Sequence, residues 1–272
     1  MTLSIEEPRN DDETLSIIVS TCKAYEDVLL NWVALYSMLN SHLNYDIHII
    51  TDKYINDLPV GINQIVCESS DWQKRLSYAI SRINSKYFLL FLEDYYFKNT
   101  VDVDEFDLLF DFVESNDISY CKMNNIPQQT LNGGTVSFLD FSKRHAINLQ
   151  LAIWSKPFLS SILGSGSAWA LEDKLNNLPR HSLNKDKFVI DNNSVIKLTN
   201  GIIKGKMDSK VNSFYDKEYS YILKYNNRNT LNWFDYSLIY IKSKGRLVKN
   251  KKIRIILKKF FTLFGINFVT KD

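Results

Sequence analysis

Two adjacent acids, Glu93 and Asp94, directly follow the most hydrophobic run of the chain, YFLLFL at 87–92. Carboxylates at the end of a buried strand are suited to hold a divalent cation, and a cation there neutralises the charge of a diphosphate. Three aromatic residues come next and place large rings at the same corner. The pattern indicates a candidate phosphate or metal site, although a solvated strand end that only caps a turn has the same pattern.

A second acidic pair, Glu172 and Asp173, closes the segment WALED that begins at Trp169. At the start of a helix this spacing puts an acid and a flat apolar ring within one turn of each other, and the two acids are about 100° apart, so only one can point into a site. A carboxylate beside such a ring can accept the proton of an attacking hydroxyl. The alternative is a helix N-terminus whose acids suit the helix dipole.

Two further elements are weaker signals of a functional site. Asp71, Trp72 and Arg75 open a helical stripe, where Asp71 would make a good N-cap, Trp72 can pack and Arg75 can be solvated. The segment 204–206 (KGK) follows an apolar stretch and is compatible with a mobile phosphate-binding loop or with an ordinary basic turn.

Other chemistries lack their motifs. The sequence has no GxSxG, no GxxxxGK[ST] and no GxGxxG, which removes the common hydrolase, P-loop and dinucleotide-binding classes. Its three cysteines form no CxxC pair, and its four histidines have no ligand spacing beside cysteine. We therefore expect neither a zinc site nor a disulfide framework, and a reducing compartment.

The elements that must position these residues alternate between short apolar runs and helical stripes over 15–122. This alternation predicts an α/β fold with right-handed crossovers and an open, mostly parallel sheet covered by helices on both faces. Ligands bind such sheets outside the carboxyl ends of the strands, where Glu93 and Asp94 stand. The expected strands span 15–20, 45–51, 61–67, 87–92, 118–122 and 135–141, and the expected helices span 25–39, a segment from about 71, 106–113, 156–163 and 168–178.

The C-terminal segment 242–272 has ten basic residues against one acid, with apolar residues at 253, 256, 257, 260 and 264. This is the composition of a basic amphipathic helix that lies on an anionic membrane surface. The alternative is a terminal helix packed on the domain with solvated lysines. Nucleic acid is disfavoured as a partner because the phenylalanines suit lipid better than a phosphate backbone.

The first thirteen residues are polar and acidic, and no run of about 18 uninterrupted apolar residues occurs. We therefore expect neither a secretory signal nor a spanning helix. The predicted location is cytoplasmic, peripheral at the inner face of the cell membrane. The predicted organisation is one domain, 1–241, followed by the membrane-associating tail, 242–272.

The order of these pieces resembles a bacterial family of glycosyltransferases associated with capsule, O-antigen and other surface-polysaccharide clusters. The resemblance spans 15–207, is most specific over 71–97, and includes a WxxED element similar to the acidic motif of family-two inverting glycosyltransferases. It is carried by LSIIVSTCKAYEDVLLNW, YDIHIITD, DWQKRLSYAISRINSKYFLLFLEDYYF, INLQLAIWSKPFLSSIL, SAWALED and IIKGK.

The resemblance implies a single, Rossmann-like A-type glycosyltransferase domain with a nucleotide-binding half, 15–122, and an acceptor half, 123–241. It implies inverting transfer of a sugar from a nucleotide-sugar donor to a glycan, lipid-linked in our expectation. It also implies Mg²⁺ or Mn²⁺ held by Asp94 and Glu93, although many A-type enzymes have Asp-x-Asp where this chain has Glu-Asp-Tyr.

The resemblance also assigns roles to single residues. The general base is Glu172 or Asp173, and we expect Glu172 because the closer family often has W..E alone. Lys206 meets the diphosphate. The residues implied at the donor are Ser20, Thr21, Asp52, Asp71, Arg75, Glu93, Asp94 and Lys206. Those implied at the sugar pocket are Gln150, Trp154 and Trp169.

Two other classes remain open at this point. A membrane-associated binding protein that kept the fold and lost catalysis is favoured by Glu93 in place of aspartate. A sugar nucleotidyltransferase would use the same kind of sheet, but the chain lacks a Gly-rich, basic N-terminal phosphate loop.

Overall fold

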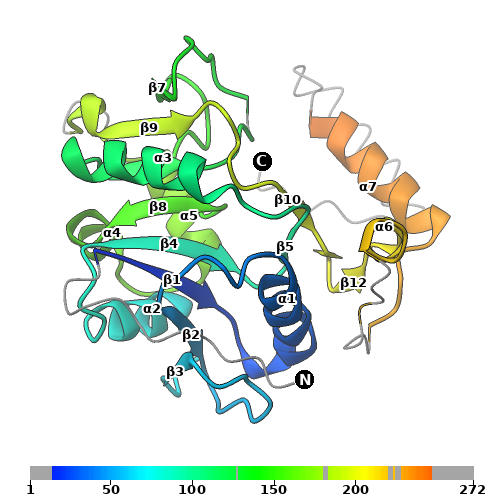
Figure 1. The fold of residues 1–272 in the computed structure, drawn as a ribbon. Coiled ribbons are helices and arrows are strands. Elements are labelled where there is room, and N and C mark those ends of the chain that lie inside the picture. Colours follow the sequence, from blue (N-terminus) through cyan, green and yellow to red (C-terminus); the bar gives the residue numbers. More distant parts are fainter. Residues whose placement is uncertain (1–13, 127, 180–182, 220–222, 224–227, 247–272) are drawn as a thin grey trace. The chain divides into compact units, whose positions relative to one another are not determined.

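The computed structural model describes residues 14–126, 128–179, 183–219, 223 and 228–246. The chain divides into two compact units, one formed by 1–201 with 223–226 and the other by 202–222 with 227–272. The first unit contains the main sheet, and the second contains the helices α6 (Ser209–Tyr219) and α7 (Trp233–Arg246) (Figure 1).

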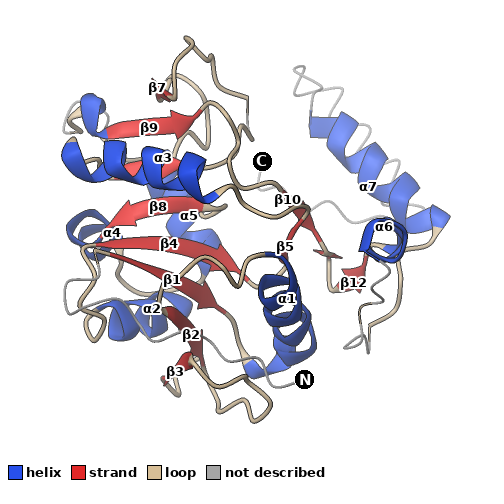
Figure 2. Cartoon of the chain, in the orientation of Figure 1, coloured by secondary structure: helices blue, strands red, loops and turns tan. Residues whose placement is uncertain are grey.

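In the described part of the first unit, the main sheet has eight strands in the order β3-β2-β1-β4-β8-β6-β9-β7 (Figure 2). Strands β3, β2, β1 and β4 are parallel, as are β6 and β9, whereas β8 runs antiparallel between β4 and β6, and β7 is antiparallel to β9. The predicted open, mostly parallel sheet is confirmed. The strands are β1 (Leu15–Ser20), β2 (Ile47–Thr51), β3 (Ile62–Val66), β4 (Tyr87–Leu92), β6 (Tyr120–Lys122), β7 (Val136–Phe138), β8 (Ala152–Ser155) and β9 (Phe188–Asp191).

Helices cover both faces of the sheet, which explains why its central strands are apolar throughout. On one face, Phe88 and Leu90 belong to a core shared with α2 (Trp72–Ile80), α4 (Lys156–Ile162) and α5 (Ala168–Asn176). On the other face, Trp32 of α1 (Glu26–Leu39) lies 5.3 Å from Phe91, ring centroid to centroid, and Phe110 of α3 (Val103–Ser115) lies 5.7 Å from Tyr87.

Side-chain caps fix where the helices begin. Asp71, Asp102, Ser155 and Ser167 each accept a hydrogen bond from the backbone N–H three residues on, at the starts of α2, α3, α4 and α5. The expected cap at Asp71 is confirmed. These starts matter for function because α5 carries both acids of the WALED segment.

A small second sheet follows the acidic pair. Strand β5 (Tyr95–Phe97) pairs antiparallel with β10 (Leu198–Asn200). The N–H of Gly201 then donates to the carbonyl of Asp94 at 2.8 Å. A side chain at position 201 would collide with the ring of Tyr96, which is fully buried and donates through its hydroxyl to Val28 of α1. The turn after β4 is thus held by the pairing of β5 with β10, by the Gly201 hydrogen bond and by the contact of Tyr96 with α1.

The second unit contains a hairpin and two helices: β11 (Ile202–Ile203), β12 (Lys206–Met207), α6 (Ser209–Tyr219) and α7 (Trp233–Arg246). The KGK segment forms the turn of the hairpin, with Lys204 and Gly205 in the left-handed region at φ 53° and 76°. Helix α7 continues across position 241, and the rest of the predicted tail, 247–272, lies outside the described residues. Within the described residues, no helix is long and apolar enough to cross a membrane.

Candidate functional site

The sheet topology gathers the predicted residues at one edge. The parallel strands β1, β2 and β4 end there, β6 ends there in register with Ala152, and the antiparallel β8 begins there. Residues after β1, β2 and β4 therefore meet residues before β8, as expected for a ligand site at the carboxyl ends of strands.

The β1–β2 corner, which we define as Ser20, Thr21, Cys22, Asp52, Arg75 and Glu93, lies at one end of this edge. Asp52 accepts a hydrogen bond from the N–H of Lys23 at 2.7 Å. Partial burial acts to raise the pKa of Asp52, but the Lys23 hydrogen bond and the nearby Arg75 charge hold it below its usual value. Asp52 is therefore anionic at neutral pH and fixes the loop after β1.

The charged members of the β1–β2 corner act on the thiol of Cys22. Burial raises the pKa of Cys22, the charges of Glu93 and Asp52 raise it further, and Arg75 opposes them. Arg75 is 6% exposed, donates to the carbonyl of Ser69 at 2.6 Å, and keeps a buried Nε without a partner. Unsatisfied buried donors of this kind are costly, so the corner is built to receive acceptor groups.

Ser20 and Thr21 form the floor of the corner. Both are nearly fully buried, and the Oγ of Ser20 has no hydrogen-bond partner. The N–H of Thr21 donates to Ile50 of β2 at 2.8 Å, which continues the sheet by one residue beyond β1.

Asp94 is an acid in an apolar setting. Burial raises its pKa to about 6, and its Oδ1 is buried without a partner. Because a buried carboxylate oxygen without a partner costs free energy, the site favours a cation or a hydrogen-bond donor at this position.

The hydroxyl of Tyr95 is influenced by residues from three parts of the fold. Burial raises the pKa of Tyr95, the charges of Asp94 and Glu172 raise it further, and a hydrogen bond from the side chain of Gln150 opposes them. Asp94 follows β4, Gln150 precedes β8 and Glu172 lies on α5. The Oε1 of Gln150 is buried and has no partner. The charges of Asp94 and Glu172 thus both act on Tyr95, and Gln150 hydrogen-bonds to it.

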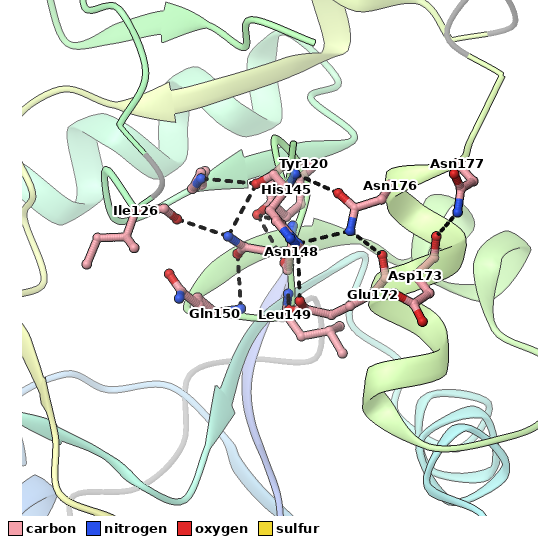
Figure 3. A network of polar contacts seen from close by, with 11 residues as sticks. Tyr120, Ile126, His145, Asn148, Leu149, Gln150, Glu172, Asp173, Asn176 and Asn177 are labelled. Carbon is pink, nitrogen blue, oxygen red and sulfur yellow. Dashed lines mark hydrogen bonds and ion pairs between the residues drawn. The ribbon is translucent and has the colours of Figure 1, made fainter. Parts of the chain in front are cut away.

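Glu172 is held by the loop before β8 (Figure 3). Its Oε1 accepts from the N–H of Leu149 at 2.9 Å, and its Oε2 lies 3.5 Å from Nδ1 of His145. Asp173 is exposed, and its backbone carbonyl accepts a hydrogen bond from the side chain of Asn177 at 2.8 Å. Of the two acids, Glu172 is therefore the one whose carboxylate points to the loop before β8.

Asn176 fixes the conformation of His145. His145 has a φ of 56°, a left-handed value that is uncommon for a non-glycine residue. Its N–H donates to Oδ1 of Asn176 at 2.6 Å, while Nδ2 of Asn176 donates to the carbonyl of Glu172 at 3.0 Å and lies 2.9 Å from Nδ1 of His145. Since the two backbone groups set the amide orientation, Nδ1 accepts, and a neutral His145 carries its proton on Nε2.

The sequence interpretation missed Lys122, the last residue of β6. Its side chain is fully buried, and its Nζ donates to the carbonyl of His145 at 3.4 Å. Burial lowers the pKa of Lys122 to about 8, against the opposing charge of Glu172. The only available signal was a lysine inside a short apolar strand.

Two expected site residues have structural contacts within the fold. Asp71 accepts from the N–H of Lys74 at 3.0 Å and from the N–H of Gly166 at 2.7 Å, so it joins α2 to the loop before α5. Trp154 is fully buried, stacked on Phe158 and edge-on to Tyr120. The expected place of Trp154 on the wall of a sugar pocket is corrected to the core beneath it.

Two more of the expected site residues, Trp169 and Lys206, remain to be placed. Trp169 is 79% exposed on the first turn of α5, three positions before Glu172. Lys206 belongs to the second unit, where its Nζ forms an ion pair with Asp235 at 2.8 Å.

The acids after β4 suit a cation that arrives with phosphate. Across the described residues, no group of three or more His, Cys, Asp or Glu side chains is arranged to hold a metal. Mg²⁺ is commonly bound by one or two carboxylates together with substrate phosphates and water. The buried, unpartnered oxygen of Asp94 fits that mode, with Glu93 adjacent.

No family model and no curated protein matches the chain. Solved structures give partial likenesses. S. aureus TarS 1–349 has a TM-score of 0.40 and 15% identity over 60% of this chain and 53% of that one. The bifunctional IspDF from Campylobacter jejuni has a TM-score of 0.33 and 13% identity over 60% and 47%. CMP:2-keto-3-deoxy-manno-octonic acid synthetase complexed with CTP has a TM-score of 0.38 and 8% identity over 66% and 88%. The chain spans about half the length of the first two.

Proposed function

We propose that the protein is a glycosyltransferase that transfers a sugar from a nucleotide-sugar donor to a hydroxyl of a glycan. The observation that carries this proposal is the pair of acids at the carboxyl end of the sheet: Asp94 follows β4 and has a buried Oδ1 without a partner, and Glu172 is held by the loop before β8. The charges of both act on Tyr95. One acid there suits the charged leaving group, and the other suits the attacking hydroxyl.

The donor is assigned to the β1–β2 corner and Asp94. The carboxylate of Asp52 and the unpartnered donors of Ser20 and Arg75 offer hydrogen bonds to a base and ribose. Asp94, with Glu93, would hold a divalent cation, which when bound neutralises the donor diphosphate. A role for Lys206 at the diphosphate stays a prediction from the sequence.

Glu172 is the proposed general base. The acceptor oxygen forms a bond to the anomeric carbon while the bond from that carbon to the diphosphate oxygen breaks. The hydroxyl proton passes to Glu172, and the nucleoside diphosphate leaves from the opposite face, which inverts the configuration. A base of this kind contributes about 10²–10⁴-fold. The exposed ring of Trp169 on the same helix offers a flat surface to the sugar.

We further propose a lipid-linked acceptor of bacterial surface-polysaccharide synthesis, reached at the inner face of the cell membrane. The support is the basic, phenylalanine-containing segment 242–272 together with α7, whose Trp233 and Phe234 are 78% and 51% exposed. Exposed aromatic side chains beside basic residues suit a membrane interface.

A panel of UDP-, GDP-, CMP- and dTDP-sugars tests the proposal. We expect one nucleotide class to raise the unfolding temperature and to be turned over to free nucleoside diphosphate, or to the monophosphate for a CMP-sugar, with Mg²⁺ or Mn²⁺ but not with EDTA. Binding without turnover of any donor, with glycan acceptors present, would instead indicate the binding protein. Release of pyrophosphate from a nucleoside triphosphate and a sugar phosphate would indicate the nucleotidyltransferase.

A further inference from the structure

Lys122 is the most deeply buried charged side chain of the site. Its side chain is 0% exposed, and among the described residues the acceptor within hydrogen-bond distance of Nζ is the carbonyl of His145, at 3.4 Å. An ammonium group has three donors, so most of its hydrogen-bonding capacity is unused. Burial of such a charge is expensive unless another charge compensates for it.

Glu172 supplies the compensating charge. Within the described residues the two side chains form no direct ion pair, but the Glu172 carboxylate is the charge that acts on Lys122. Both groups also bind the same loop, since Lys122 contacts the carbonyl of His145 and Glu172 contacts Leu149 and the His145 ring. The loop continues into Gln150, which reaches the Tyr95 hydroxyl.

We propose that Lys122 is a positioning residue for Glu172, holding the loop 145–150 and the carboxylate in the arrangement that faces the Tyr95 hydroxyl. This inference rests on the proposed role of Glu172 as base. Lys122 acts through Glu172 and the loop, because its own side chain is buried beneath them. A displacement of about 1 Å at a reacting group can cost 10²-fold in rate.

The charge of Lys122 gives this role a pH signature. The titratable groups around it are Glu172 from α5, His145 in the loop and Tyr120 on its own strand. As the pH rises through about 8, Lys122 loses its proton and the carboxylate loses its partner, so kcat falls. Arginine keeps its charge throughout this range.

The test compares K122M and K122R with wild type, using K74M on the exposed face of α2 as the control. We expect kcat of K122M to fall about 100-fold with an unchanged KM for the donor. K122R should regain part of the activity and keep it above pH 8. The double variant K122M/E172Q should be no slower than E172Q, because a residue that acts through another gives non-additive effects. A K122M enzyme as active as K74M, or additive losses in the double variant, would overturn the inference.

A second measurement needs no substrate. The same four proteins, wild type, K122M, E172Q and the double variant, form a thermodynamic cycle for thermal unfolding. We expect K122M to raise the unfolding temperature more in the E172Q background, where the lysine has lost its compensating charge. Equal shifts in both backgrounds would contradict the pairing of Lys122 with Glu172. Absence of turnover by wild type with every donor would reject the proposed function and leave this cycle to decide the pairing.

Discussion

The N–H of Gly201 donates to the carbonyl of Asp94 at 2.8 Å and so connects the end of β10 to the turn after β4. This contact requires a residue without a side chain, because the ring of buried Tyr96 occupies the space that a Cβ would take. The backbone of Asp94 is thus held by Gly201, a residue that lies far from it in the sequence.

Replacing Gly201 with alanine should disturb this corner. We expect G201A to lose about 1–3 kcal/mol of unfolding free energy, as for overpacked cores, and to bind the donor more weakly because Asp94 moves. Denaturant unfolding and donor-induced thermal shifts measure the two effects. G164A is the matched control, since a Cβ there has one ordinary contact, 3.9 Å from Gln73. Equal stability of both variants would show that the ring of Tyr96 yields easily.

The E172Q variant should lose transfer and keep the donor. Glutamine fills the same space and can still accept the Leu149 hydrogen bond, but it cannot take up a proton, so we expect kcat to fall by about 10²–10⁴-fold. Assays of nucleotide release measure the first effect and thermal shifts with the donor the second. D173N is the control, because Asp173 is exposed. Full activity in E172Q with loss in D173N would transfer the role to Asp173.

Stability should depend on Lys122 in a defined pH window. Its folded pKa, about 8, lies below the ordinary 10.5, so between these values the unfolded chain holds a proton that the folded protein has released. Unfolding free energy therefore rises with pH across the window, and the penalty is complete below pH 8. We expect K122M to be more stable than wild type at pH 7 by on the order of 3 kcal/mol, from 10.5 − 8 pKa units. Denaturant unfolding should show this advantage shrinking by pH 10.5, and a constant difference across the window would contradict it.

The thiol of Cys22 reports on the charges of the β1–β2 corner. Because Glu93 helps to raise the pKa of Cys22, we expect E93Q to increase the rate of iodoacetamide labelling at neutral pH, since the thiolate is the reactive form. Mass spectrometry of the labelled peptide measures the rate, with Cys67 in the same protein as the internal reference. A bound donor should slow labelling of Cys22, and labelling that is indifferent to both changes would separate Glu93 from this corner.

Membrane attachment is predicted for the C-terminal segment. We expect the full chain to float with vesicles that contain anionic phospholipid, and a chain ending at Arg246, which keeps α7 but lacks most of the basic tail, to float much less. Added salt should weaken flotation because the attraction includes charge. Equal partitioning of the two chains would remove the tail as the anchor.

The central strands and their acidic ends could be predicted from the sequence because both faces of β1 and β4 are covered, so apolar residues run without alternation. The starts of α2, α4 and α5 were also predicted, since capping residues act locally, whereas α3 begins at Val103 rather than at the expected 106. The packing by which the charges of Asp94, after β4, and Glu172, on α5, both act on Tyr95 is a tertiary property. The resemblance alone suggested that these two acids share a site.

The misses have a common physical origin in long-range pairing. Strand β8 lies in a mixed apolar segment, and only its pairing with β4 and β6 defines it. That pairing decides that Trp154 points into the core, and β6 ends with Lys122 beneath the loop before β8. Nothing in the neighbouring sequence indicates that a lysine in a three-residue strand is buried.

Strand β8 also constrains how the first unit can move. Because it is hydrogen-bonded to β4 on one side and β6 on the other, the strands on either side of β8 share one continuous sheet. Rotating one half away from the other would break the β4–β8 ladder in the middle of the core. Adjustment to ligands within this unit is therefore expected in the loops at the ends of the strands rather than in a hinge between β4 and β8.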